Sequence, residues 1–491
     1  MKKILQTLLL LVAVVTAQAQ VRYLDEVFAN VHVDTTITYA QNYGYYTGFA
    51  TLEPLVMDVY TPEGDTASHR PVILLSHNGS FLPEAFTHGL LGLCFSGRKD
   101  SSIVELCKRF AKRGYIAVSF DYRLGWNGTA ADQTTRTKTI IQAVYRAMQD
   151  AKSCVRYFRN DVINGTNQWK ADTSRFVIGG SNSGAYVALA ASSLNDVNEL
   201  NNIKFVDING SFVKQDTLGD FDGFGGVQNY DNYPGISSRF NCTLSLGGAV
   251  GDTSWIQAGE TPILAFHGVN ESSTQYNTGI VNTASGQPVI EVSGPGDFMP
   301  FVESLGNNNA FQPSNFQQGP PNRNGLGAQT VSIEGLYPFY GQKFEPWNWY
   351  DSACYTSSSR MQALTGGDAS PAKGNRFIDT IMGYSAPRLY KLLYDPSYTG
   401  STGIKEFKRN IDLSLFPNPA NSRINIIVSM TEKPISTVGV FDITGRLAKE
   451  VSGINAFSRS IDMSEMNTGI YLVTIKLTNG ATATRKVVIE K

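Results

Sequence analysis

The sequence predicts a doubly wound α/β sheet followed by a small all-β sandwich. Continuous apolar runs alternate with segments of helical period through most of the chain, the pattern of buried parallel strands joined by helices. Beyond residue 412 the pattern changes to period two, interrupted by Pro, Gly and Asn, which is typical of antiparallel strands. With 491 residues, 42% of them hydrophobic, the chain can bury more than one core. We expect domains at residues 20–400 and 412–491, joined by a linker at residues 401–411.

The first predicted elements follow from local patterning. Residues 52–64 alternate apolar and polar side chains and end in a Pro-Glu-Gly turn, which predicts a strand. Residues 70–81 contain a nearly continuous apolar run, typical of a strand buried on both faces. Residues 101–115 repeat apolar side chains at helical spacing and end at Gly114, and residues 116–126 predict another buried strand.

The alternation continues through the rest of the α/β part. The remaining predicted elements are a long amphipathic helix, a strand–turn–helix unit, two buried strands and a closing helix, at residues 137–161, 175–192, 243–250, 261–268 and 374–395. Between about residues 270 and 337, Asn, Gly, Ser, Gln and Pro accumulate. This composition predicts a long surface insertion, with disorder as the alternative.

The N-terminus has the features of a cleaved secretory signal at residues 1–19. Lys2 and Lys3 precede an apolar run, which ends at the small-residue sequence Ala17-Gln18-Ala19. A membrane anchor is the alternative, but the run is shorter than a bilayer span requires. No later stretch reaches that length, so we expect export without a transmembrane anchor.

Charge and composition exclude several function classes. The formal net charge is −1 and only 17% of residues are charged, with no basic stripe, so we expect no nucleic-acid partner. The cysteines and histidines are scattered without the spacing of a metal site, so we expect no metal and no cofactor. Five cysteines permit up to two disulfides and one free thiol, and their pairing stays open: Cys94, Cys107, Cys154, Cys242 and Cys354.

The C-terminal segment resembles the sorting domain of type IX secretion cargo. The matching motifs are "FPNPA", "DITGR", "GIYLV" and the basic-apolar ending "RKVVIEK". Patterning alone predicts a small β-sandwich, for which a carbohydrate-binding module is the alternative. The resemblance implies that the type IX machinery is a partner and carries the protein through the periplasm and across the outer membrane. The expected location is therefore the cell surface or the medium.

Residues 55–387 resemble an α/β-hydrolase of the carboxylesterase type, similar to secreted lipase-like and feruloyl- or acetyl-esterase-like members. The motifs are "VILLSHNGSF", "FAKRGYIAVSFDYRLGW" and "SRFVIGGSNSGAYVALAAS". The resemblance implies a nucleophile on a sharp strand-to-helix turn, an acid after the seventh strand and a histidine after the eighth. It also implies an oxyanion loop whose amides come from Asn78, Gly79 and Ser80, together with Ser183.

The expected nucleophile is replaced. The family pattern is G-x-S-x-G, and Gly180-Ser181-Asn182-Ser183-Gly184 keeps both glycines but has Asn182 at the centre. An amide cannot form an acyl-enzyme. Ser181 and Ser183 are rescue candidates one residue to either side, although a shift of one residue turns the side chain in another direction. Their alternative role is local hydrogen bonding within the turn.

The other two triad positions also depart from the family. Glu271 stands where the family has Asp, a change that still allows the carboxylate to hold an imidazole. Phe344 lies near the expected histidine, and the sequence contains no histidine after His267. Without an imidazole there is no base for the hydroxyl and no acid for the leaving group.

Three hypotheses follow. The preferred one is a secreted pseudohydrolase that has lost acyl transfer and binds a partner or a small ligand, either an ester or a carbohydrate-like molecule. The alternative is an active carboxylic ester hydrolase in which Ser181 or Ser183 works with His267 or His77. A third is a structural cell-surface protein. The aromatic residues of "EPWNWYDSACY" fit either a ligand platform or the core.

Overall fold

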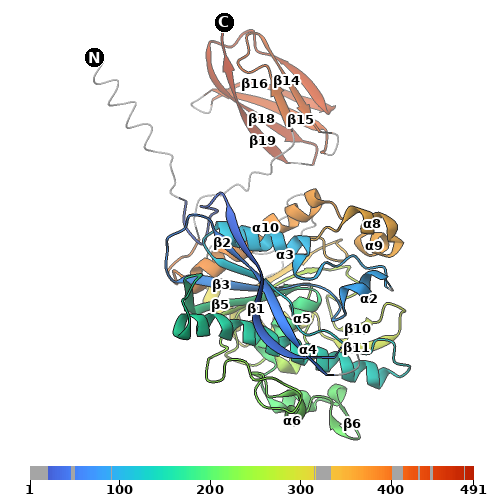
Figure 1. Ribbon diagram of the computed structural model, residues 1–491. Coiled ribbons are helices and arrows are strands. Elements are labelled where there is room, and N and C mark those ends of the chain that lie inside the picture. The colour runs from blue at the N-terminus through green and yellow to red at the C-terminus, as the bar shows by residue number, and fades with distance from the viewer. Residues whose placement is uncertain are drawn as a thin grey trace. The chain divides into compact units, whose positions relative to one another are not determined.

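The computed structural model forms two compact units, the second beginning after Gly400 (Figure 1). It describes residues 20–45, 50–89, 91–314, 316, 333–400, 413–429, 432–442, 446–479 and 481–491. The expected signal at residues 1–19 and linker at residues 401–411 lie outside these residues. No helix in the described part of the chain is long and apolar enough to cross a membrane.

The first unit is built on an eight-stranded sheet with the order β1-β2-β4-β3-β5-β8-β9-β12. The last six strands in this order are mutually parallel, and β1 and β2 form an antiparallel edge. The strands are β1 (Val31–Gly44), β2 (Thr51–Pro62), β3 (Arg70–Ser76), β4 (Ile116–Phe120), β5 (Ala171–Ser181), β8 (Cys242–Leu246), β9 (Ile263–Gly268) and β12 (Leu336–Phe339). This arrangement confirms the predicted doubly wound α/β sheet.

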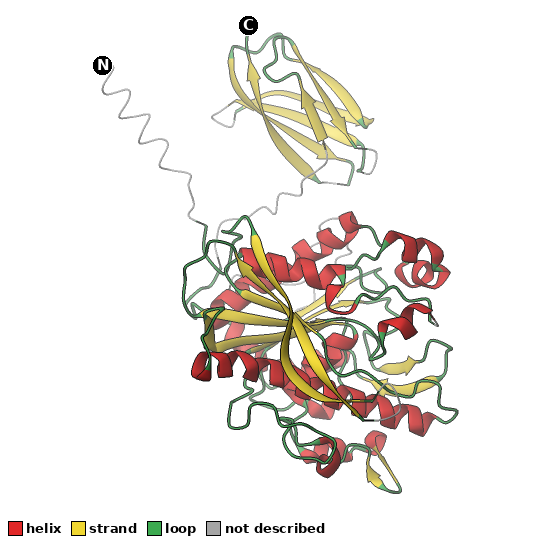
Figure 2. Ribbon diagram, in the orientation of Figure 1, coloured by secondary structure: helices red, strands yellow, loops and turns green. Residues whose placement is uncertain are grey.

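Helices cover both faces of the sheet, as Figure 2 shows, because alternate side chains of its strands point to opposite sides. Val72 and Leu74 of β3 pack in the core that also contains α4 (Gln133–Asn164), α5 (Ser183–Ser193) and α7 (Pro295–Ser304). Ile73 and Leu75 pack on the other side, with α3 (Ser101–Lys112) and α10 (Pro371–Leu393). Every residue of β3 is buried, as expected for the centre of a parallel sheet.

Shorter elements surround this frame. They are the helices α2 (Glu84–Gly89), α6 (Gln215–Leu218), α8 (Ser352–Ser357) and α9 (Ser359–Thr365), the hairpins β6 (Val206–Asp207) with β7 (Gly210–Ser211) and β10 (Gly279–Asn282) with β11 (Pro288–Val292), and 3-10 turns at Gly97–Lys99, Val197–Asn201, Ile203–Phe205, Thr253–Trp255 and Asn307–Phe311.

Much of the segment expected as a surface insertion at residues 270–337 is packed into the fold. Val289, Ile290 and Val292 of β11 are buried, and Phe298 and Met299 of α7 are buried completely. The structure therefore differs from the expectation for these described residues: β11 and α7 contribute to a hydrophobic core against one face of the sheet. The polar composition of the whole segment gave no indication of this burial, because its apolar residues are few and separated by polar ones.

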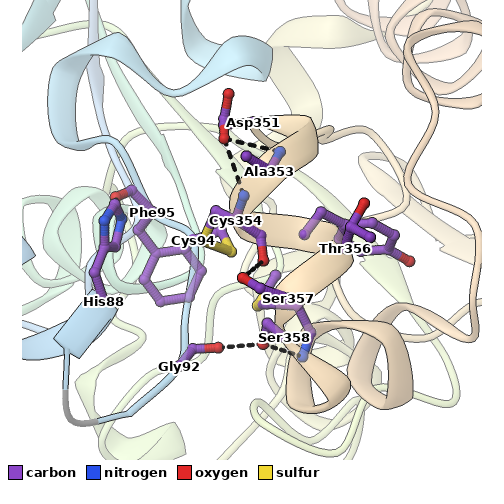
Figure 3. The surroundings of a disulfide bond; sticks show 12 residues. His88, Gly92, Cys94, Phe95, Asp351, Ala353, Cys354, Thr356, Ser357 and Ser358 are labelled. Carbon is purple, nitrogen blue, oxygen red and sulfur yellow. Dashed lines mark hydrogen bonds between the residues drawn. A yellow bond between two sulfur atoms is a disulfide. The ribbon is translucent and has the colours of Figure 1, made fainter.

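A disulfide links two loop regions of the first unit. Cys94 follows α2, and Cys354 lies in α8, 260 residues later in the sequence (Figure 3). Beside it, Ser358 Oγ donates a hydrogen bond to the Gly92 carbonyl, and the Asp351 carboxylate accepts from the first amides of α8. The other three cysteines are free and buried.

The second unit is an all-β domain of two antiparallel sheets, with the orders β13-β14-β17 and β16-β15-β18-β19. Ile424, Ile426 and Val440 are among the side chains of its own core. The strands are β13 (Leu413–Phe416), β14 (Arg423–Val428), β15 (Ile435–Asp442), β16 (Leu447–Ala456), β17 (Ser458–Asp462), β18 (Gly469–Leu477) and β19 (Thr482–Ile489). The predicted all-β C-terminal fold is confirmed.

Candidate functional site

Asn182 occupies a sharp turn between β5 and α5. Its backbone has φ 47° and ψ −110°, a strained conformation for a residue with a side chain. The backbone N–H of Asn182 donates a hydrogen bond to the Leu246 carbonyl, which connects the turn to β8. The backbone therefore has the form of a nucleophile elbow, and the central residue of that elbow is Asn182.

The glycines of the motif permit this turn by close approach. A Cβ on Gly184 would collide with the carbonyl oxygen of Ser76, and a Cβ on Gly180 would collide with the backbone of Gly184. Strand β3 and the start of α5 can therefore touch only because both positions lack side chains. The two glycines of the sequence motif are therefore explained by the lack of space for a side chain on either side of this turn.

Glu271, at the expected acid position after β9, lies beside Asn182. A Cβ built on Gly247 would be 3.4 Å from both Asn182 Oδ1 and Glu271 Oε2. Ser273 donates to Glu271 Oε1 at 2.6 Å, and Thr274 donates to Asn182 Oδ1 at 3.3 Å. Burial raises the pKa of Glu271 well above its usual range, and its carboxyl group lies beside the side-chain amide of Asn182.

Ser183 fills the position that the expected oxyanion loop surrounds. Its hydroxyl accepts from the amides of Gly79 at 3.0 Å and Ser80 at 3.1 Å, and donates to Asn78 Oδ1 at 3.1 Å. The Tyr122 hydroxyl lies 3.0 Å away. The structure thus brings together all four residues expected at the oxyanion loop. The two loop amides that would stabilise an oxyanion are bonded to a side chain of the protein itself.

Ser181 points to different partners. Its hydroxyl donates to Glu345 Oε1 at 2.7 Å and accepts from Trp347 Nε1 at 2.9 Å. Both partners are almost completely buried, as is Ser181. Glu345 has φ 39°, and its second oxygen accepts from the Tyr350 hydroxyl at 2.8 Å. Ser181 is therefore held in a closed polar cluster, with its hydrogen-bonding capacity in use.

The two histidines considered as relocated bases are both engaged with backbone or carboxylate groups. His77 Nδ1 is 2.6 Å from the Asn78 carbonyl, and Nε2 is 3.4 Å from Asp121 Oδ1. Burial by itself would lower the pKa of His77, but the hydrogen bond and charge of Asp121 reverse this, so the net pKa is raised. Neither ring nitrogen of His77 forms a hydrogen bond with a serine in the described part of the chain.

His267 lies at the end of β9 and is completely buried. Its Nε2 is 3.0 Å from the Thr274 carbonyl, and burial lowers the pKa of His267 to about 4. The ring is therefore neutral at pH 7. It bonds the backbone of the loop that carries Glu271, and this contact gives it a structural role.

Phe344, near the expected histidine position, packs with Leu93, Phe95 and Met361 in a small apolar cluster. Its ring centroid is 6.0 Å from that of Phe95. The next residue, Glu345, provides the polar side chain of this loop, and it contacts Ser181 instead of Asn182. The sequence interpretation missed Glu345, whose only signal was a charged residue within an aromatic run.

Asn182, Ser183 and Phe344 line one cavity of about 1160 Å³, together with Asn78 and Ser80. Its wall comes from the loop after β3, α4, α5, the hairpin β10–β11 and α9. Among the described residues that line it there is no histidine. The described residues also contain no cluster of three or more His, Cys, Asp or Glu side chains suited to a metal ion.

The aromatic residues of the "EPWNWYDSACY" segment lie outside this cavity wall. Trp347 is completely buried in the main core, and Trp349 packs against the same core. Tyr350 and Tyr355 stack on each other with centroids 6.3 Å apart. Trp347 is therefore a core residue, and the other three rings are partly buried against apolar clusters.

Two families match the chain. Residues 57–284 match the family described as BD-FAE, and residues 414–490 match the secretion system C-terminal sorting domain. The chain therefore carries an esterase-like α/β-hydrolase domain and a sorting domain of type IX secretion, which indicates a secreted or cell-surface protein. No curated protein matches the chain.

Solved structures with similarity include esterase 2 of Thermogutta terrifontis. Its apo form is 13% identical, with 74% of this chain and 96% of that chain covered and a TM-score of 0.37. The form phosphoramylated by tabun is 14% identical, with 67% and 90% covered and a TM-score of 0.34.

Proposed function

We propose that the esterase-like domain has lost acyl transfer and serves, after export, as a ligand-binding pseudohydrolase. The observation that carries this proposal is Asn182 on the strained elbow, where acyl chemistry needs a hydroxyl or thiol. The side chain that reaches the elbow from the acid position is Glu271, and within the described residues its carboxyl group is hydrogen-bonded to Ser273 and to no imidazole.

The state of the oxyanion loop supports the same conclusion. A substrate carbonyl would need the amides of Gly79 and Ser80, but these already donate to Ser183 Oγ. Entry of a carbonyl oxygen would have to displace that hydroxyl and break its bond to Asn78. In an active site such donors are free to bind the negative charge that develops on the substrate oxygen in the transition state. Here they are already hydrogen-bonded within the protein.

The alternative of a relocated triad has one feature in its favour and one against it. Ser183 is a hydroxyl that lines the cavity beside two amides. It has no imidazole partner in the described part of the chain, because His77 and His267 bond elsewhere. A serine without a base near its hydroxyl stays protonated at neutral pH and is a poor nucleophile.

Hydrolysis of short-chain nitrophenyl esters by the purified full-length protein tests the proposal. We expect a rate equal to that of buffer and no labelling by a fluorophosphonate probe. Turnover that disappears in Ser183→Ala or Ser181→Ala would instead establish the relocated triad. Tryptophan fluorescence provides the control for folding in each variant.

A second variant separates the nucleophile from the base. Asn182→Ser restores a hydroxyl at the elbow but supplies no imidazole, so we expect the substituted protein to remain inactive. Asn182→Ala is the matched control, since it removes the amide without adding a hydroxyl. Turnover in Asn182→Ser and its absence in Asn182→Ala would show that Asn182 alone accounts for the lost activity, and the argument from the missing imidazole would then be wrong.

A further inference from the structure

The charges that line the elbow cavity have one sign. Four cationic side chains contribute to its wall: Lys138, Arg146, Lys214 and Arg360. No Asp or Glu occurs among the described residues that line it. The whole chain has a net charge of −1, so this bias does not follow from composition. A low-dielectric cavity lined by one sign of charge attracts ligands of the opposite sign.

Among these four cations, Arg146 is buried and forms no ion pair with a carboxylate in the described part of the chain. It lies on α4 with an exposed fraction of 4%, and its guanidinium donates to the Gly125 carbonyl at 2.8 Å. Within the described residues its buried Nε has no hydrogen-bond acceptor. The Tyr45 ring packs 4.6 Å from its Cζ.

The carboxylate nearest to Arg146 along the helix is already used. Asp150, one turn further on α4, binds the Arg123 side chain at 2.8 Å and also accepts from its backbone amide. Burial and the charge of Arg123 lower the pKa of Arg146 to about 10, which leaves Arg146 protonated at neutral pH. Asp150 also favours the charge of Arg146 electrostatically, but one carboxylate then serves two buried guanidiniums. A buried cation with incomplete charge compensation is costly, and an anion in the cavity would reduce that cost.

Arg360 adds a second guanidinium in a similar state. It lies on α9 and donates to the carbonyls of Leu91 and Ala284, which positions it between the α2 loop and the hairpin β10–β11. It forms no ion pair within the described residues. The protein thus contributes two cavity guanidiniums whose bonds are to neutral carbonyl groups.

Most of the remaining wall is apolar. Phe81, Phe86 and Trp126 line it near the oxyanion loop, and Phe212 and Trp255 line it elsewhere. Such rings favour an aromatic or acyl body. From the charges and the rings, we propose that the cavity binds a carboxylate that carries an apolar body, with Arg146 as the main anion partner. This inference rests on the proposed ligand-binding role of the same cavity.

Isothermal titration of the full-length protein with naphthalenecarboxylate and its carboxamide tests the inference. The two probes share their shape and differ in charge. We expect the carboxylate to bind the natural protein about 10- to 100-fold more tightly, the range for a charge-assisted hydrogen bond. Arg146→Met should abolish this preference. Lys108→Gln removes the same charge from an exposed position outside the cavity and should leave the preference unchanged.

Equal affinity for the two probes, or an undiminished preference in a folded Arg146→Met, would overturn the inference. If Arg146→Met does not fold, Arg360→Met replaces it, with a smaller loss of preference expected, and the comparison of the two probes on the natural protein still decides. The same preparations are assayed with nitrophenyl esters. Ester turnover with a carboxylate preference would refute only the loss of catalysis, whereas equal binding without turnover would refute only the anionic ligand.

Discussion

Replacing Asn182 by glycine tests whether the elbow still stores backbone strain. At φ 47° and ψ −110°, a residue with a Cβ is strained by roughly 1–3 kcal/mol, which glycine avoids. Glycine also gives the unfolded chain more freedom, which costs about 0.5–1 kcal/mol. Relative to Asn182→Ala, we therefore expect Asn182→Gly to be more stable by about 1 kcal/mol.

The comparison with Asn182→Ala cancels the loss of the amide side chain, including its long contact with Thr274. Ala372→Gly, at an exposed position in the first turn of α10, is the control for an ordinary backbone and should lose stability. Urea unfolding monitored by tryptophan fluorescence measures all three, since the five tryptophans precede residue 400. If Asn182→Gly proves less stable than Asn182→Ala, the elbow is not strained and the reasoning fails.

Three further perturbations address stability. Replacing Cys94 and Cys354 by serine opens a loop of 260 residues, so we expect a loss of roughly 3–5 kcal/mol and a lower urea midpoint in non-reducing buffer; an unchanged midpoint would contradict this. Asp150→Asn leaves the buried guanidinium of Arg123 without its counter-charge, and should lower the free energy of unfolding by about 3–5 kcal/mol; a loss below about 1 kcal/mol would refute the pairing. Burial raises the pKa of Asp100 to about 8, so between pH 5 and 8 the folded carboxyl holds a proton that the unfolded chain has lost. As the pH rises through this range, the free energy of unfolding of the natural protein should therefore fall relative to that of Asp100→Asn by roughly 1 kcal/mol per pH unit. If the two proteins change stability with pH in parallel, the raised pKa of Asp100 is refuted.

The central elements of the fold were predictable because their patterning is local. The buried run of β3 and the helical period of α4 are both evident in the sequence, and the structure contains both elements. The edge strand β1 was missed, since more than half of its residues are partly or fully exposed and many are polar. The burial of β11 was missed because it depends on packing against α4, which is distant in the sequence.

The candidate site was predictable where a motif fixes the backbone, and not where contacts are distant. The G-x-x-x-G spacing located Asn182, because glycine at both of these positions allows β3 and α5 to approach closely. Nothing in the sequence indicates that the Ser183 hydroxyl accepts hydrogen bonds from the backbone amides of the oxyanion loop, since such a contact depends on atomic positions to within about an ångström. The contact of Glu345 with Ser181 joins residues 164 positions apart, and no local pattern encodes it.

The bridge between Cys94 and Cys354 has a consequence for when the cavity takes shape. Leu93 and Phe95 flank one cysteine and Arg360 follows the other, and all three belong to the cavity wall. Cystines persist in oxidising surroundings and are rare in the cytosol. In a newly made chain these parts of the cavity wall would therefore not be cross-linked until the chain leaves the cytoplasm, so the wall would reach its final stability only after export.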